Sequence, residues 1–432
     1  MKDMPALLLA VLSVRDPRLF AMVFDRVVDD AKMLRTFVQI VRSGAVGRKS
    51  LGTRPKKQIL AWLEARSDEA LFRASVGNDP SLADVLKMMH PKPSSDRRRA
   101  LYGYLVGKPH DAAALPALVQ RFEQYKRERS GEPPDVPFRM LTALGLGTAE
   151  WTAIAKTAGW QTTRMNLNTF ARHGVFADEA VAELVAARLA DPALVAKARA
   201  FPYQLMMAYV ASGPGVPAVV KDALQAAMEH ALSNVPVVDG HVWVCPDVSG
   251  SMHSPVTGWR KGATTAVRCV DVAALFAAAM LRTNPRTSVL PFEHAVVSIE
   301  LNPRDSVMTN AAKLAKVGGG GTNVSAPLAK INAARAPVDL VVVVSDNQSW
   351  VDVSRGASTE TLKQFELVKR RCPRAKLVCI DVTPYAHTQA PDRDDILNVG
   401  GFSDAVFEVV AAFASGEGAA RRWVELIEAV EV

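Results

Sequence analysis

Cysteine is scarce in this 432-residue chain: the sequence has four, and none belongs to a C-x-x-C pair. They are scattered and lie mostly within apolar runs, which is typical of buried thiols in a reducing compartment rather than of a disulfide frame or a zinc site. Long apolar runs are missing as well, since none reaches the roughly 18 residues that a membrane-spanning helix needs. The opening MKDMPALLLAVLSVRDP has no small-residue cleavage site, so we expect an amphipathic helix there and not a signal peptide. These absences predict a cytoplasmic protein that does not enter a membrane.

Several catalytic motifs are also absent. The stretch PDVSGSMHS lacks the first glycine of the G-x-S-x-G serine-hydrolase motif, and GGGGTN lacks the lysine of a P-loop. No H-E-x-x-H zinc motif occurs. A hydrolase stays open as an alternative because His253 and His294 are available, but it would need an activating group beside Ser249. We predict that the chain is not an enzyme.

Negative charge falls short of positive charge in one half of the chain only. Residues 1–235 hold 32 Lys and Arg against 23 Asp and Glu, whereas residues 236–432 hold 20 against 21. The whole excess of positive charge is therefore N-terminal. A basic half joined to a neutral half indicates a polyanionic partner for the first half alone.

The same two halves differ in hydrophobic period. Up to about residue 234, segments such as DDAKMLRTFVQIVRSG, KQILAWLEA, SLADVLKMMH, LPALVQRFEQYKRE and AVAELVAARLA carry apolar residues at three- and four-residue spacing, with Gly- and Pro-rich breaks between them. Helices of this length predict an α-solenoid or an irregular helical array, although no strict repeat period occurs. A compact helical bundle remains the alternative.

Beyond residue 234 the pattern alternates. The runs HVWVCPDV, TSVLPFE, VDLVVVVSD and AKLVCIDVT are short and rich in β-formers, and amphipathic stretches such as CVDVAALFAAAMLRT separate them. Near-continuous apolar strands between helices predict a doubly wound α/β domain with a parallel sheet covered on both faces. We therefore expect two domains, residues 1–234 and residues 235–432.

Carboxylates and hydroxyls follow two of these strands. Asp247, Ser249 and Ser251 alternate directly after the first strand, and Asp346 follows VDLVVVVS. Thr322 comes between them, after four glycines. Ligands of open parallel sheets bind at the carboxyl ends of strands, and an all-oxygen donor set suits Mg²⁺ best, with Mn²⁺ or Ca²⁺ also compatible. The sequence predicts a divalent-cation site, against the alternative of a polar turn.

Basic residues are concentrated in the segment from residue 42 to residue 99. Thr53 with Pro55 indicates a helix start, so the charges around it would gather near free N–H groups that attract phosphate. Ser94 or Ser95 predicts a second helix start beside an arginine triplet. A solvated basic face is the alternative. The candidate nucleic-acid-binding residues are Arg42, Arg48, Lys49, Arg54, Lys56, Lys57, Arg97, Arg98 and Arg99.

The order D-x-S-x-S, Thr, Asp resembles the metal-ion-dependent adhesion site of von Willebrand factor A domains. In that family the serines and the threonine ligate the ion directly or through water, and the aspartates lie in the coordination sphere or next to it. The resemblance implies a metal site made of Asp247, Ser249, Ser251, Thr322 and Asp346.

The joined architecture, together with GRKSLGTRPKKQILAWL, MMHPKP, MNLNTFARHGVF, CPDVSGSMHSPVTG and SDNQSW, resembles the Ro autoantigen family, whose helical part is the TROVE module, and especially its bacterial members. The resemblance implies a HEAT-like helical ring or partial ring followed by the A domain. It also implies binding of small noncoding Y RNAs and of single-stranded ends of misfolded RNAs. RNA quality control and processing with an exoribonuclease such as polynucleotide phosphorylase would follow. Relative to the family, this chain opens inside the helical array, and we expect the first helices to be lacking.

With this resemblance, the sequence predicts an RNA-binding protein of a ribonucleoprotein. The alternative is an A-domain interaction module that binds an acidic protein ligand through its metal. Convergence of the basic residues around GRKS and SSDRRR would favour the first, and scatter would favour the second.

Overall fold

The computed structural model describes residues 3–76, 80–129, 131–256, 267–346, 359–383, 390–391, 393–403 and 405–415. The chain divides into two compact units, Met1–Ile154 and Ala155–Val430. The predicted change of secondary structure at residue 235 therefore falls inside the second unit, which holds helices as well as the sheet. Within the described residues, no helix has both the length and the apolar character needed to cross a membrane.

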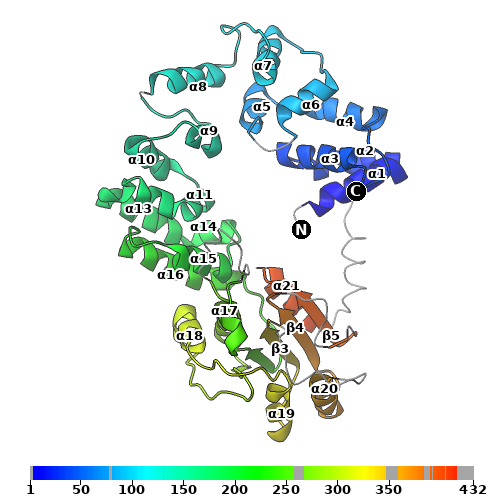
Figure 1. Ribbon diagram of the computed structural model, residues 1–432, viewed down its shortest axis with the longest axis vertical. Helices are drawn as coiled ribbons and strands as arrows, with labels where there is room; N and C mark the ends of the chain where they lie inside the picture. The colour runs from blue at the N-terminus through cyan, green and yellow to red at the C-terminus, as the bar shows by residue number, and fades with distance from the viewer. Residues whose placement is uncertain are drawn as a thin grey trace. The chain divides into compact units, whose positions relative to one another are not determined.

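The first unit is helical (Figure 1). Its helices are α1 (Met4–Arg15), α2 (Pro17–Val27), α3 (Ala31–Ser43), α4 (Thr53–Glu64), α5 (Asp68–Ala74), α6 (Leu82–Met89), α7 (Asp96–Val106), α8 (Ala117–Glu128) and α9 (Phe138–Thr142). The three- and four-residue spacing decides what is buried: α3 buries Leu34, Phe37, Val38 and Val41. The predicted helices of this unit are confirmed.

Side-chain caps begin several of these helices. Asp30 accepts the N–H of Met33 at the start of α3, and Ser95 accepts the N–H of Arg98 at the start of α7. The start of α4 at Thr53 is confirmed, but its N-cap is Gly52, which offers no side-chain acceptor to the free N–H groups of the first turn. This helix start matters below.

The helical part of the second unit leads into the sheet. It comprises α10 (Thr148–Thr157, across the division), α11 (Trp160–Met165), α12 (Leu167–Arg172), η1 (Val175–Ala177), α13 (Glu179–Ala190), α14 (Pro192–Lys197), α15 (Pro202–Ala211), α16 (Ala218–Ala231) and η2 (Leu232–Asn234). Buried Val181, Val185 and Leu189 of α13 meet α16, which buries Val220, Leu224 and Ala227. The buried faces of α13 and α16 form the core of this helical part.

The described strands form one parallel sheet in the order β2-β1-β3-β4-β5. They are β1 (Val242–Pro246), β2 (Thr287–Val289), β3 (Leu340–Ser345), β4 (Lys376–Asp381) and β5 (Ile396–Gly400). β3 is buried along its whole length, as its unbroken apolar run predicts. The prediction missed β5, an edge strand whose Asn398 and glycines hide the β pattern.

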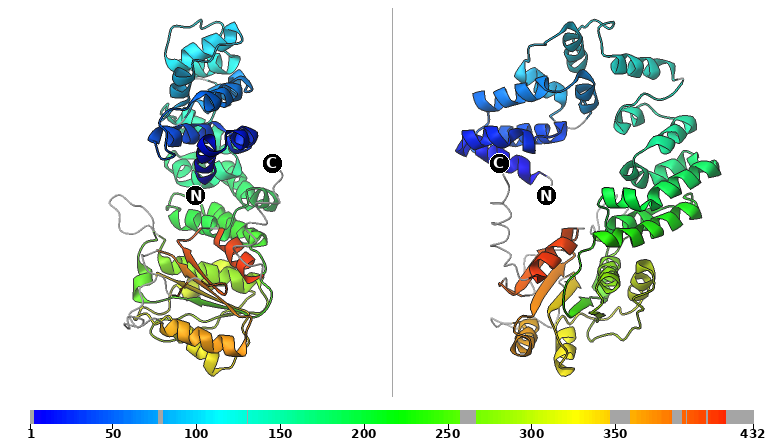
Figure 2. Two further views of the ribbon diagram at one scale, coloured as in Figure 1. Left: turned by 90° about the vertical axis from the view of Figure 1, so that its right-hand side faces the viewer. Right: turned by 180° about the vertical axis from the view of Figure 1, so that it is seen from behind.

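Helices cover both faces of the sheet (Figure 2). On one face α19 (Ala326–Ala333) and α20 (Glu360–Arg371) pack Leu328, Ile331, Phe365 and Val368 against alternate strand residues such as Val343. On the other face lie α17 (Cys269–Thr283) and α21 (Ala405–Ala414), and α18 (Val307–Leu314) packs on α17. This is the predicted doubly wound α/β domain.

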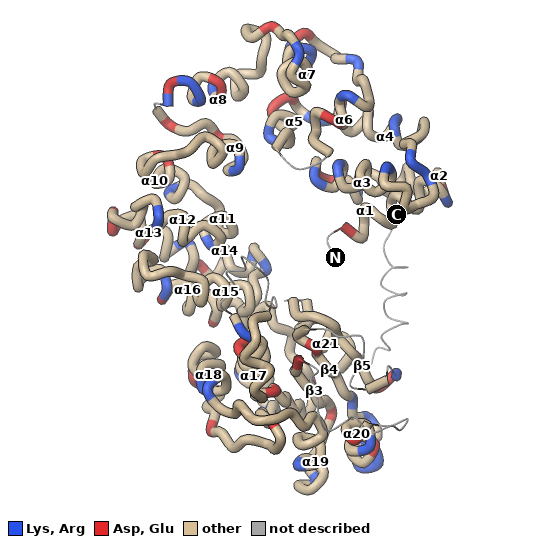
Figure 3. The backbone as a smooth tube through the Cα atoms, viewed as in Figure 1, with Lys and Arg blue, Asp and Glu red and all other residues tan. Residues whose placement is uncertain are grey.

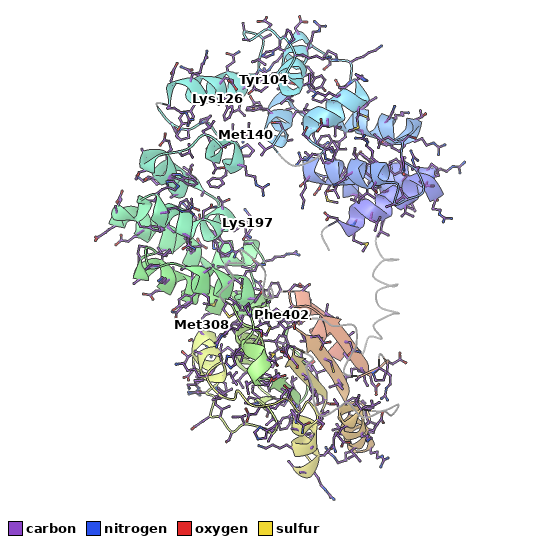
Figure 4. The ribbon with its side chains drawn as sticks, viewed as in Figure 1. Tyr104, Lys126, Met140, Lys197, Met308 and Phe402 are labelled. Carbon is purple, nitrogen blue, oxygen red and sulfur yellow. The ribbon has the colours of Figure 1, made fainter. Side chains whose placement is uncertain are left out.

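An aromatic cluster joins α15 to this domain. The ring centroids of Phe201 and Phe407 lie 6.0 Å apart with the planes nearly parallel, and Phe407 stacks on Phe276 at 4.8 Å. Tyr203 meets Phe402 edge to face at 5.2 Å, and Figure 4 marks Phe402 beside α21. Aromatic pairs of this kind add to the stability that apolar burial already provides. The helices from residue 155 and the α/β domain are thus one packed body.

Candidate functional site

The carboxyl edge of the sheet between β1 and β3 is the point where the strand order reverses. The chain leaves β1 to form β2 on one side of it and returns on the other side as β3. Open α/β sheets bind ligands in the crevice at such a point. Asp247 follows β1 and Asp346 follows β3, so the strand pairing brings the two carboxylates to this crevice.

Asp247 anchors the loop that follows β1. It is fully buried; its Oδ1 accepts the N–H of Ser249 at 2.8 Å and its Oδ2 accepts the hydroxyl of Ser345 at 2.7 Å. Burial raises the pKa of Asp247 to about 6, opposed by these hydrogen bonds and assisted by the Asp346 carboxylate. A buried acid of this kind favours a compensating cation nearby.

A third carboxyl lies on the same edge. Asp381 ends β4, next to β3, and burial followed by the charge of Asp346 raises its pKa to about 7. The charge of Asp346 therefore acts on both other acids at neighbouring strand ends, whereas the sequence pattern drew attention to Asp247 and Asp346 only. The third was missed because Asp381 is followed by a single hydroxyl residue, Thr383, and not by the D-x-S-x-S pattern. Its signal was its position at the end of a strand.

The hydroxyl groups supply the remaining oxygens. Ser249 and Thr322 are buried, and the Oγ atoms of Ser249 and Ser251 lie 3.3 Å apart. Oxygens bound at about 2.1 Å to one octahedral ion stand about 3 Å apart, so this spacing fits neighbouring ligands of Mg²⁺. Ser251 is the second residue of the short helix η3 (Gly250–His253).

A glycine loop, residues 318–321, brings Thr322 to the site. Gly318 has a φ of +86°, and a Cβ there would come within 2.3 Å of the Val248 carbonyl oxygen. Main-chain bonds join the two loops, from Gly319 N to Val248 O and from Gly250 N to Gly320 O, each 2.9 Å. The glycines therefore allow close packing of the Thr322 loop on the loop that carries Ser249 and Ser251.

The donor set fits a hard divalent cation. Oxygen atoms of carboxylates and hydroxyls follow the strand ends at the crevice. The described residues contain no group of three or more His, Cys, Asp and Glu that could hold a metal ion, so the predicted site depends on its hydroxyl oxygens. Residues 257–258 and 347–350, which complete two of the quoted motifs, lie outside the described residues. Asp247, Ser249, Ser251, Thr322 and Asp346 remain the predicted metal residues.

The hydrolase alternative finds no support in the described contacts. The Ser249 hydroxyl pairs with Ser251, whereas His253 Nδ1 lies 2.9 Å from an Arg268 nitrogen and His294 Nδ1 lies 2.9 Å from Glu293. Neither histidine is hydrogen-bonded to Ser249 in the part of the chain that the structure describes.

Replacing Gly318 by Ala should disturb this site. A positive φ and a contact with a main-chain oxygen both oppose the added methyl, so we expect a loss of about 2 kcal/mol in the free energy of unfolding and weaker Mn²⁺ binding. Urea denaturation and titration with Mn²⁺ measure the two effects. Gly321→Ala is the matched control because a Cβ there meets nothing within 4 Å. Equal behaviour of the two variants would contradict the role given to Gly318.

The basic residues form two groups at opposite ends of α4. Arg42 ends α3, and Lys49, Arg54, Lys56 and Lys57 surround the start of α4; all five are exposed. We call these five the α3–α4 basic group; Figure 3 shows Lys and Arg recurring along this part of the chain. None has a carboxylate within 4 Å among the described residues. Arg48 is half-buried and donates to the main-chain oxygens of Ser50 and Ser13.

The arginine triplet is different. Arg97 pairs with Asp68 and Glu69, and Arg99 pairs with Asp96. Arg98 is buried and donates to Leu63 O at 3.0 Å and Arg66 O at 2.6 Å, besides its ion pair with Asp68.

The basic residues around GRKS and those around SSDRRR therefore do not gather into one group. Arg98 touches the C-terminal end of α4, about 18 Å along the helix from the group at its start. The prediction that Arg98 contacts phosphate is therefore corrected, because its guanidinium already serves two carbonyls and a carboxylate. Sequence reading could not foresee this because the acids that neutralise the triplet lie mostly on another helix, α5.

Comparison with known proteins agrees with this fold. Residues 241–414 match the family described as the Ro60 vWA domain. The RNA-binding protein RO60 of Deinococcus radiodurans is 28% identical over 359 residues, which cover 78% of this chain and 66% of that protein. The chain thus spans about two thirds of that relative's length. The crystal structure of the Deinococcus radiodurans RO (RSR) protein superposes with a TM-score of 0.73 at 23% identity, covering 96% of this chain and 88% of the other. Residues 241–414 are thus similar to the Ro60 vWA domain, and the chain as a whole is similar in sequence and fold to the Ro protein of Deinococcus radiodurans.

Proposed function

We propose that the chain is an RNA-binding protein whose α3–α4 basic group contacts the phosphate backbone. The observation that carries the proposal is a set of exposed cations, none with a described carboxylate within 4 Å, gathered around a helix start. Basic residues clustered on a surface attract polyanions, so a group of cations without carboxylate partners favours a polyanionic ligand. The name of the Deinococcus relative supports the same partner.

The start of α4 adds a second element. Its N-cap, Gly52, leaves the first-turn N–H groups without a side-chain acceptor, and the cations of Arg54, Lys56 and Lys57 stand on that same turn. Helix N-termini bind phosphate through such groups and through the helix dipole. These contacts read the backbone and shape of a folded RNA rather than its bases.

We further propose that the RNA partner is a small structured noncoding RNA of the Y type, and that single-stranded ends of misfolded RNA are a second ligand. RNA quality control or processing in the cytoplasm, together with an exoribonuclease such as polynucleotide phosphorylase, is the corresponding cellular role. None of the contacts described at the candidate site supports a catalytic role for the chain itself. This part of the proposal rests on the family resemblance.

The A domain would hold Mg²⁺ at Asp247, Ser249, Ser251, Thr322 and Asp346. Two carboxylates and three hydroxyls leave room for water or for an acidic group of a partner to complete the coordination sphere. Binding of an acidic protein through the metal is therefore the second candidate function, and it is compatible with the first because the two sites use different residues.

The double change of Lys56 and Lys57 to Ala should weaken binding of all structured RNAs about equally. Each lost phosphate contact releases fewer counterions, so the slope of log K against log salt should flatten by about one to two units. Filter binding or fluorescence anisotropy with a folded stem RNA, across a series of salt concentrations, measures both. Mn²⁺ binding at the A domain should not change.

The matched control is the double change of Arg97 and Arg99 to Ala. Both are exposed, but carboxylates already neutralise them, so RNA affinity and slope should change little. Loss of binding in the control but not in the Lys56 and Lys57 variant would place the RNA at the start of α7. No loss in either would contradict the proposal for this surface. Binding of an acidic protein that EDTA abolishes would support the second candidate function.

A further inference from the structure

Glu293 lies between the two loops of the metal centre. It follows β2 in a segment that runs beside the loop after β1: Phe292 N donates to Pro246 O at 3.1 Å, and Val248 N donates to Phe292 O at 2.8 Å. Phe292 also pairs with Asp247 in an isolated parallel bridge. The backbone of the next residue, Glu293, is therefore held in place beside the loop that carries Asp247.

Two hydrogen bonds from Glu293 bracket Thr322. The main-chain oxygen of Glu293 accepts the N–H of Asn323 at 2.8 Å, and its carboxylate Oε2 accepts the N–H of Gly320 at 2.7 Å. The side chain is only 16% exposed, and its Oε1 lies 2.9 Å from His294 Nδ1. Thr322 is thus held from both sides by one residue of a different loop.

The glycine loop has few other restraints. Its bonds to Val248 and Gly250 are between main-chain atoms, and Glu293 is the side chain that accepts from the loop among the described contacts. A Cβ at Gly320 would stand 2.8 Å from Glu293 Oε2, so glycine at this position is what allows the carboxylate to approach. Sequence and structure agree that this contact is built into the loop.

We propose that Glu293 is a positioning residue of the metal centre, which holds the glycine loop so that the Thr322 hydroxyl reaches the ion. The proposal rests on the metal site proposed above and adds a residue outside its five-residue motif. Glu293 acts as a hydrogen-bond acceptor for Gly320, not as a ligand. Partners that orient metal ligands in this way commonly govern affinity by 10- to 100-fold.

The test compares Glu293→Ala with Glu293→Gln in the full chain. Glutamine keeps an acceptor oxygen for Gly320 and removes the charge, whereas alanine removes both. Mn²⁺ binding, followed by the electron paramagnetic resonance signal of the free ion, should weaken roughly 10-fold or more in Glu293→Ala and by less than about 3-fold in Glu293→Gln. Glu300→Ala, an exposed acid further along the same connection, should bind as the unchanged protein does.

A second measurement does not depend on the metal. Hydrogen exchange of peptides that span residues 316–326, recorded in EDTA, should show faster exchange in Glu293→Ala and near-normal exchange in Glu293→Gln. Unchanged Mn²⁺ affinity in Glu293→Ala would overturn the positioning role, and an equal loss with Gln would show that the charge acts instead. If the unchanged protein binds no Mn²⁺, the metal site itself fails, and faster exchange in Glu293→Ala would then show a loop restraint without a metal function.

Discussion

Asp247→Asn should abolish Mn²⁺ and Mg²⁺ binding while leaving the protein folded. The substitution keeps the shape of the side chain and an acceptor for the Ser249 N–H, but it removes a charge from a site whose other oxygens are mostly neutral hydroxyls. Loss of a carboxylate from such a set lowers the affinity for a divalent ion steeply, and we expect a decrease of roughly 100-fold or more. Isothermal titration with Mn²⁺ measures this directly.

The stability of the variant in EDTA is an informative control. Because burial raises the pKa of Asp247 above its ordinary value, the ionised carboxylate lowers the stability of the folded protein at neutral pH when no cation is present. Asparagine removes that cost, so the free energy of unfolding in EDTA should not fall. Asp394→Asn, at an exposed position of the same unit, should bind Mn²⁺ normally. Mn²⁺ binding that survives in Asp247→Asn would refute the site.

Arg98→Ala should destabilise the first unit by about 3 kcal/mol. The guanidinium is buried and serves Leu63 O, Arg66 O and the Asp68 carboxylate, so its removal takes this donor from two main-chain carbonyls and leaves the largely buried Asp68 paired with Arg97 alone. Urea denaturation followed by circular dichroism reports the change.

The neighbouring Arg97 offers a matched comparison. Its side chain is 52% exposed and its ion pairs with Asp68 and Glu69 are at the surface, so Arg97→Ala should cost less than about 1 kcal/mol. RNA affinity should fall in Arg98→Ala only as far as the fraction of folded protein falls. A stable Arg98→Ala protein with weakened RNA binding would restore Arg98 as a phosphate contact.

Arg98 and Asp247 show what sequence could and could not reveal. The position of Asp247 was predictable because a buried strand ends where its apolar run stops. A polar residue directly after such a strand lies at the carboxyl edge of the sheet. Arg98 was not, since its role depends on Asp68 and on carbonyls of α4, which local spacing does not encode. The same reason hides Glu293, whose partner Gly320 is 27 residues away.

Secondary structure followed the same rule. The helix α3 and the strand β3 were predictable because their burial leaves a pattern of apolar residues in the sequence, periodic in α3 and continuous in β3. The edge strand β5 was missed because an exposed edge imposes no such pattern. The predicted domain limit at residue 235 is the point where the spacing of apolar residues changes from a helical to a strand pattern. The packing of α15 on the α/β domain could not be predicted in this way, because it depends on aromatic contacts between distant residues.

That packing decides how the chain can be divided for expression. A fragment beginning where the strands begin would lack Phe201 and Tyr203, and it would turn the ring faces of Phe407 and Phe402 toward water. Newly uncovered aromatic surface promotes self-association and poor solubility. A fragment that starts near residue 155 keeps these rings covered, so a well-behaved A domain of this chain carries the preceding helices with it.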